Sequence, residues 1–291
     1  MSWRVVVISE NAKLDYKMDY MVVRNRETTK RIHLSEISVL LLETTAISIT
    51  AYLLCELSKR KIDVVFCDQK RLPYGVLMPL TGSHDTSQCY RRQTEWAKDM
   101  KDTVWAEIIK SKIFGQTVVL TKHDRPEAAQ LRKYLGEIQP GDATNREGHA
   151  AKVYFNAIFG MGFSRKAEDN INSALNYGYT ILLSAVAREI TTRGYATQFG
   201  IFHDNVHNAL NLASDLMEPF RPFVDMTVLQ MDHTDFGKEE KRTLVNVLNL
   251  QIPIDGQNQY MLRAIGIYVK SVLDAMNEKD PYLICFPQYE L

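Results

Sequence analysis

The sequence predicts an α+β protein in which an N-terminal antiparallel β domain, residues 1–80, precedes an all-α C-terminal domain, residues 87–291. Two observations lead to this class. The first 80 residues hold short runs rich in β-branched side chains, joined by short polar connectors. After position 86 the apolar residues recur instead with the 3.6-residue period of helices. The 291 residues are enough for two domains with their own cores.

The N-terminal domain is expected to consist mainly of hairpins. Residues 13–20, KLDYKMDY, alternate polar and apolar side chains as a half-buried strand does. The connectors between the apolar runs are short, which favours antiparallel hairpins over crossover connections. A helix is expected at residues 45–61, with Thr45 as its N-cap and basic residues in its last turn. The remaining expected strands are residues 3–9, 30–43, 63–68 and 75–80.

A polar segment at residues 81–86, TGSHDT, is the expected domain boundary, and helices follow it. The apolar residues from Ala97 to Ile108 fall on one face of a long helix. The helix at 167–194 is too long and too apolar for a surface helix, so we expect it at the centre of the domain. Two more helices are expected, one opened by Pro126 and ending near Ile138, the other at 147–160.

Composition limits the environment and the partners of the chain. The four cysteines have no paired spacing, and no apolar run reaches the 18 residues of a membrane span. A cytoplasmic protein without a secretory leader or membrane contact is therefore expected. The net charge is zero from 35 basic and 35 acidic residues, which argues against a polycationic coat for nucleic acid. The last third is the acidic part, so a nucleic-acid face is expected in the middle third.

Residues 201–222, IFHDNVHNALNLASDLMEPFRP, carry polar side chains at helical spacing. A solvated helix face is one interpretation, and a divalent-metal site is the other. On one straight helix His203 and Glu218 would stand roughly 22 Å apart, too far for one ion. If a helix began near Asn208, about 16 Å of extended chain before it would bring His203 back alongside Glu218. A metal site therefore predicts a turn within residues 204–208.

A third ligand would come from another element, and Glu147 is the candidate. The alternative for Glu147 is a charge at a helix N-terminus favoured by the helix dipole, which spacing alone favours. Four basic residues in or just before the long apolar helix are candidates for phosphate contacts, with surface solvation as the alternative for Arg165 and Lys166. They are Arg165, Lys166, Arg188 and Arg193.

Four motifs in order resemble one known family. They are NREGHAAKVY, LNYGYTILLSAVAREITTRGY, FGIFHDN and DLMEPFRPFVD, within residues 145–225. Together they resemble the CRISPR-associated Cas1 integrases of spacer acquisition. The opening MSWRVVVIS is similar to the subtype that accompanies the single-protein RNA-guided effector nuclease, type II. The resemblance extends to the whole chain through the β domain and the helical catalytic domain of that family.

This resemblance implies a site and a reaction. Glu147, His203 and Glu218 would be catalytic metal ligands for Mg²⁺ or Mn²⁺, with Asp215 close by. The implied enzyme is an endonuclease and integrase that joins the 3′-hydroxyl ends of a double-stranded DNA fragment to CRISPR repeat DNA. The β domain would serve dimerisation, and two homodimers would flank a dimer of the small Cas2 subunit in a heterohexamer. The effector nuclease and a DNA-end-binding ring protein are further implied partners.

Two other functions compete with this one. A catalytically silent DNA-binding scaffold of the same complex would keep the shape without the reaction, and the intact Glu147, His203 and Glu218 count against it. A metal hydrolase for a small substrate would need a deep enclosed pocket instead of an open face.

Overall fold

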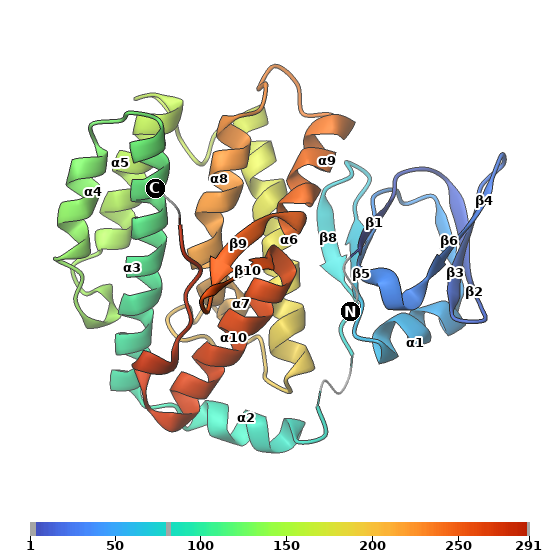
Figure 1. Ribbon diagram of the computed structural model, residues 1–291, viewed down its shortest axis with the longest axis horizontal. Coiled ribbons are helices and arrows are strands. Elements are labelled where there is room, and N and C mark those ends of the chain that lie inside the picture. The colour runs from blue at the N-terminus through green and yellow to red at the C-terminus, as the bar shows by residue number, and fades with distance from the viewer. Residues whose placement is uncertain (1–3, 80–82, 290–291) are drawn as a thin grey trace. The chain divides into compact units, whose positions relative to one another are not determined.

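The computed structural model describes residues 4–79 and 83–289, and the chain divides into two compact units, residues 1–84 and 85–291 (Figure 1). The expected α+β class is confirmed. Parts of three expected segments lie outside the described residues: Trp3, Leu80, and the first two residues of the boundary segment 81–86. In the described part of the chain, no helix is both long and apolar enough to cross a membrane.

The N-terminal unit holds two sheets in the described residues, with strand orders β1-β5-β7-β8 and β4-β3-β2-β6. Leu14, Met21, Leu40 and Leu53 belong to the core of this unit. Its elements are β1 (Arg4–Ile8), β2 (Ala12–Lys17), β3 (Tyr20–Arg24), β4 (Thr29–His33), β5 (Ile37–Leu42), β6 (Ile47–Ile49), α1 (Ala51–Lys59), β7 (Asp63–Cys67) and β8 (Pro73–Val76).

The expectation of an antiparallel domain is wrong for half of the strand pairs. β2–β3, β3–β4 and β7–β8 are antiparallel, but β1–β5, β5–β7 and β2–β6 are parallel. The chain leaves β1 to build the β2–β4 meander and returns to β5, so β1 and β5 are not joined by a short connector and pair in parallel. In the first sheet a short connector joins paired strands at β7–β8, and this pair is antiparallel. All six residues of β5 are buried, as in strands of parallel sheets covered on both faces.

Two local expectations in this unit are corrected. The alternating segment 13–20 is a hairpin, because Met18 and Asp19 have φ of 48° and 65° and turn the chain between β2 and β3. The face assignment changes at the turn: Tyr16 pairs with buried Met21, whereas Tyr20 pairs with Lys17 and lies on the other face of the sheet. Thr45 is not a helix cap: residues 47–49 form β6, and Thr50 caps α1 by accepting a hydrogen bond from the Leu53 amide.

The C-terminal unit is mainly helical, with α3 and α6 as its longest helices (Figure 1). α6 contacts α7, α8, α9 and α10, and α3 contacts α4, α5, α7, α8 and α10, so both lie at the centre of the unit. Its elements are α2 (Thr86–Thr94), α3 (Lys98–Lys122), α4 (Ala128–Leu135), α5 (Arg146–Phe159), α6 (Asn170–Thr192), α7 (Asn211–Leu216), the 3₁₀ turn η3 (Glu218–Phe220), α8 (Arg221–Leu229), α9 (Lys238–Val245), β9 (Gln251–Ile254), β10 (Gln257–Tyr260) and α10 (Met261–Glu278).

The expectation of an all-α domain is wrong in one place. β9 and β10 form an antiparallel hairpin whose turn is Asp255–Gly256, with φ of 51° and 70°. An Asp-Gly pair is a strong hairpin signal, and residues 251–260 carry it. The expected helices at 97–108, 126–138, 147–160 and 167–194 are observed as α3, α4, α5 and α6 with shifted ends.

Close packing of α6 on α8 depends on Gly178, and we predict that Gly178→Ala destabilises the protein. An added Cβ would lie 2.5 Å from Val224 Cγ1 and 3.3 Å from Leu244 Cδ2. Overpacking costs about 1–3 kcal/mol, against about 1 kcal/mol gained from the helix propensity of alanine. Urea unfolding should show a net loss of up to about 2 kcal/mol. Gly162→Ala is the control, since no neighbour lies within 4 Å of its added Cβ; equal stability of the two variants would contradict this packing argument.

Candidate metal centre

Glu147 is placed by the N-terminus of α5. Asn145 is the N-cap of this helix, and its side chain accepts a hydrogen bond from the Gly148 amide. Asp142 accepts hydrogen bonds from the amides of Arg146 and Glu147, at 2.8 and 2.9 Å. The first turn of α5 is therefore held by two side chains, and the Glu147 carboxylate extends toward α3, where Lys112 lies.

Glu218 begins the 3₁₀ turn η3 between α7 and α8, directly before Pro219. Its side chain is only 3% exposed, so its charge needs partners. Oε1 lies 3.1 Å from Arg221 Nε, and Oε2 lies 2.6 Å from Lys112 Nζ. Tyr289 supports this turn from another segment, because its hydroxyl donates to the Pro219 carbonyl and its ring stacks on Phe223.

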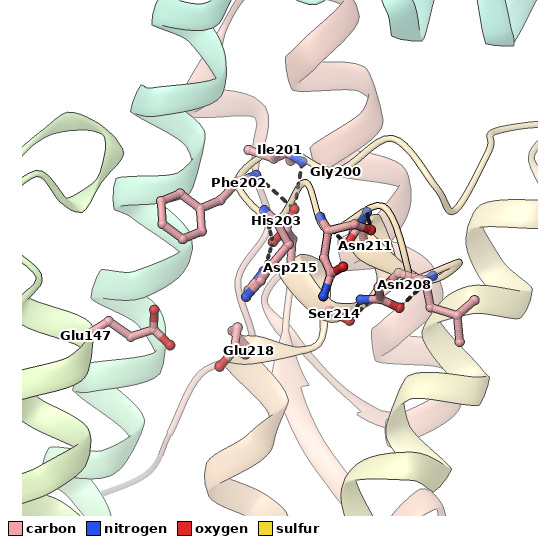
Figure 2. Close-up of polar contacts among 12 residues, drawn as sticks. Glu147, Gly200, Ile201, Phe202, His203, Asn208, Asn211, Ser214, Asp215 and Glu218 are labelled. Carbon is pink, nitrogen blue, oxygen red and sulfur yellow. Dashed lines mark hydrogen bonds and ion pairs between the residues drawn. The ribbon is translucent and has the colours of Figure 1, made fainter. Parts of the chain in front are cut away.

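His203 is placed by a loop folded around the buried carboxylate of Asp215. This carboxylate accepts hydrogen bonds from the amides of Ile201, Phe202 and His203, at 2.7, 2.9 and 3.2 Å. It also accepts one from His203 Nδ1 (Figure 2). Hydrogen bonding to Asp215 raises the pKa of His203 against the opposing effect of burial. A carboxylate on Nδ1 orients the ring and leaves Nε2 as the nitrogen that can bind a metal.

The turn predicted within residues 204–208 is observed in the loop around Asp215. α7 begins at Asn211, and residues 204–210 are not helical, so His203 and Glu218 are not on one straight helix. Asn211 closes the loop by donating to the carbonyls of Gln198 and Asn205, both at 3.0 Å. Gly200 is required here, since an added Cβ would lie 2.2 Å from the His203 carbonyl oxygen.

Lys112 of α3 joins the two glutamates. Its side chain is 7% exposed, and Nζ lies 2.6 Å from Glu147 Oε1 and 2.6 Å from Glu218 Oε2. Burial disfavours the charged ammonium, but the two carboxylates outweigh it and raise the pKa of Lys112. Burial likewise opposes ionisation of Glu147, and Lys112 outweighs it, so the pKa of Glu147 is lowered. Lys112 and Glu147 are therefore both charged at neutral pH.

Glu147, His203 and Glu218 come from three separate segments and face a common space (Figure 2). The two carboxylates meet at one ammonium, and His203 is held beside them by Asp215. Within residues 4–79 and 83–289, no three His, Cys, Asp or Glu side chains approach closely enough to hold one metal ion as they stand. The donor set still fits a divalent cation, because two carboxylates and an imidazole are common ligands and the carboxylates already share one cationic partner.

The four basic residues expected to bind DNA do not form one patch. Arg165 and Lys166 precede α6 and Arg188 and Arg193 lie near its other end, about 30 Å away at 1.5 Å per residue. Arg165 donates to the side chains of Asn172 and Asn176, and Arg188 and Arg193 both pair with Glu189. Lys166 is exposed. Intramolecular partners thus hold the three arginines.

Residues that the sequence interpretation missed surround the site. Lys112 and Arg221 neutralise the glutamates, and Lys112 had a visible signal: it continues the buried stripe of Val104 and Ile108 at a spacing of four. Phe202 stacks on buried Trp105 with ring centroids 4.4 Å apart and an interplanar angle of 2°. A cavity of about 490 Å³ opens beside them, lined by Lys98, Lys101, Phe199, Phe202 and His203 among others.

Comparison with known proteins assigns the chain to a class. Residues 5–246 match the family model described as CRISPR associated protein Cas1. A CRISPR-associated endonuclease Cas1 from Neisseria meningitidis is 32% identical over 294 residues, which cover 99% of this chain and 97% of the relative. The chain therefore belongs to the Cas1 family, and the resemblance seen in the sequence is confirmed.

Two solved structures share the fold at 18% sequence identity. A casposase bound to integration product has a TM-score of 0.77, covering 96% of this chain and 92% of that one. A Cas6-RT-Cas1–Cas2 complex has a TM-score of 0.75, covering 99% of this chain and 36% of the longer chain. These similarities establish the two-part fold.

The buried carboxyl of Asp225 in α8 predicts a pH dependence of stability. Burial raises the pKa of Asp225 to about 6, although the Tyr179 and Tyr154 hydroxyls act to lower it. The folded pKa exceeds the unfolded one, so the native state binds more protons and stability falls as pH rises from about 4 to about 6. The shift of about two units corresponds to at most about 3 kcal/mol.

The test is Asp225→Asn, whose amide remains neutral and whose oxygen can still accept a hydrogen bond from the Tyr179 hydroxyl. We expect the unfolding free energy of the native protein, minus that of the variant, to decrease between pH 4 and 6.5 and then level off. A difference that stays constant or increases over this range would contradict the assignment.

Proposed function

We propose that the chain is a divalent-metal-dependent DNA endonuclease and integrase of CRISPR spacer acquisition, with Glu147, His203 and Glu218 as metal ligands. One observation carries the proposal: two glutamates from different elements converge on a single cation, beside a histidine oriented by Asp215. Membership of the Cas1 family supports the same conclusion.

The proposed reaction is a transesterification. The 3′-oxygen of the DNA fragment forms a new P–O bond in the target strand, and the bond from that phosphorus to its former 3′-oxygen breaks. The leaving oxygen takes up, overall, the proton lost by the attacking hydroxyl. A bound Mg²⁺ or Mn²⁺ would stabilise the negative charge gathered on the phosphate oxygens. Asp215 would keep His203 in one orientation, and Arg221 would keep Glu218 in place.

The surroundings of His203 are suited to a DNA strand. Its side chain is 41% exposed, so the site is open to solvent, unlike the deep pocket expected of a hydrolase for small substrates. Phe202 is 48% exposed and rests on Trp105, which leaves aromatic surface on which a base could stack. Lys98 and Lys101 line the same cavity and could approach the backbone phosphates of that strand.

The proposed partners follow from the family. We propose that the chain forms a homodimer through the β unit and that two such dimers bind a Cas2 dimer. The substrates would be a double-stranded DNA fragment and CRISPR repeat DNA. The effector nuclease and a DNA-end-binding ring protein are proposed as further partners. We propose that the protein and these partners act in the cytoplasm. A fold shared with a chain of a Cas1–Cas2 complex supports the assembly. The four free cysteines, Cys55, Cys67, Cys89 and Cys285, suit a reducing compartment.

A catalytically silent scaffold is the second candidate. The observation in its favour is that no three candidate ligands in the described residues stand at chelating distance. Such a scaffold would bind the same DNA and the same Cas2 partner without joining strands.

Strand transfer tests the proposal against this alternative. The protein with its Cas2 partner is given a labelled duplex with free 3′-hydroxyls and a plasmid bearing repeats, with manganese, magnesium or chelator. We expect joined product that depends on the metal and falls at least about 100-fold in Glu147→Gln, His203→Ala and Glu218→Gln, since each ligand contributes several kcal/mol. Glu107→Gln is the control, because Glu107 pairs with Lys110 on the exposed side of α3. DNA binding without any joining would support the scaffold.

Salt dependence tests the proposed DNA contacts at Arg165, Lys166, Arg188 and Arg193. Lys166→Ala should weaken binding to all sequences alike and reduce the slope of log affinity against log salt by about one. The three arginines have intramolecular partners. Their alanine variants should therefore lower the free energy of unfolding and change DNA affinity less than Lys166→Ala does. The contacts would be abandoned if all four variants kept the native affinity and salt slope.

A further inference from the structure

We propose that Lys112 is an internal counter-ion that competes with the divalent cation for Glu147 and Glu218, and so keeps the metal affinity of the DNA-free protein low. This inference rests on the proposed ligands. Its first support is position: Nζ lies 2.6 Å from one oxygen of each glutamate. Metal–oxygen distances are about 2.0–2.6 Å, so a cation shared by the same two oxygens would occupy almost the same place. The ammonium and the metal therefore exclude each other there.

Charge is the second support. Glu147 and Glu218 bring two negative charges, and Lys112 and Arg221 bring two positive charges that lie against them. The ligand pair is thus neutralised by the chain itself. These four side chains together exert no net attraction on a divalent cation. The cation can bind the two carboxylates only when the Lys112 ammonium moves away from them.

Burial is the third support. The side chains of Lys112 and Glu218 are 7% and 3% exposed, so water screens their interaction poorly. Lys112 comes from α3, Glu147 from α5 and Glu218 from η3, so the ammonium also fixes the distance between the two ligand segments. The four-carbon stem of lysine is flexible enough to move the ammonium while the helices stay in place.

The displaced ammonium would remain inside the site, where a phosphate is its natural partner. DNA binding should therefore favour the metal-loaded arrangement, and by linkage the metal should favour DNA binding. Lys112 would in this way couple loading of the metal to arrival of the substrate.

The experiment measures Mn²⁺ affinity of the full chain without DNA, by calorimetry and by the electron paramagnetic resonance signal of free Mn²⁺. We expect Lys112→Gln to bind Mn²⁺ at least tenfold more tightly than the native protein, and Lys112→Arg to bind no more tightly than the native protein. Lys110→Gln is the matched control, since Lys110 lies on the same helix, pairs with Glu107 and should leave the affinity unchanged. Added DNA should tighten Mn²⁺ binding in the native protein more than in Lys112→Gln.

A purely structural role, in which Lys112 only positions the two glutamates, predicts a different Mn²⁺ affinity. If Lys112 only held the ligands together, Lys112→Gln would bind Mn²⁺ equally or more weakly, and that outcome overturns the proposal. Thermal unfolding with and without Mn²⁺ is the second readout, and the stabilisation by Mn²⁺ should be larger in Lys112→Gln than in the native protein. Glu218→Gln tests the ligand assignment separately from the role of Lys112. If this variant binds Mn²⁺ as tightly as the native protein, the proposed ligands are wrong, irrespective of the result for Lys112→Gln.

Discussion

One buried ammonium sets the geometry of the C-terminal unit. Lys112 binds Glu147 and Glu218 at equal distances, and these three residues belong to α3, α5 and η3. Removing three charges from water is costly unless each finds a close partner. The long helix α3 therefore has to present Lys112 where the N-terminus of α5 and the turn after α7 meet. A lysine in a buried stripe weakens the core locally unless its charge is paired, and here the two glutamates supply that pairing.

The buried side chain of Asp215 positions His203, as Lys112 positions the two glutamates. Its carboxylate is fully buried and collects three backbone amides and the His203 ring. The loop from Gly200 to Asn205 has no regular secondary structure of its own, so these hydrogen bonds replace those of a helix or sheet. Asp215 and Glu218 are three residues apart on either side of the α7–η3 junction. The histidine and one glutamate are thus positioned by the same short stretch of chain.

The sequence predicted much of this arrangement and missed parts of it for identifiable reasons. Helix periodicity located α3, α4, α5 and α6, because long amphipathic or apolar segments carry a strong local signal. Distance along an ideal helix excluded a straight helix if His203 and Glu218 share one metal ion, and the turn that this hypothesis predicted is observed. Parallel pairing of β1, β5 and β7 was missed because strand order depends on contacts between distant segments, which local alternation does not encode. Lys112 was missed for the same reason, since its partners lie 35 and 106 positions further along the chain.

The balance of charge explains how a cluster of buried carboxylates can be stable without a bound metal. A cluster of unpaired carboxylates would bind metal tightly but would repel itself in the metal-free chain, which would destabilise the fold around it. Here Lys112 and Arg221 remove that repulsion, and Asp215 neutralises the positive charge that hydrogen bonding favours on His203. The centre can therefore fold before it binds a cation. Since its own cations already neutralise the glutamates, the metal proposed for this site would add net positive charge, and that excess would suit the phosphate of a nucleic acid strand. The charges that stabilise the metal-free fold would then make an anionic substrate part of the complete site.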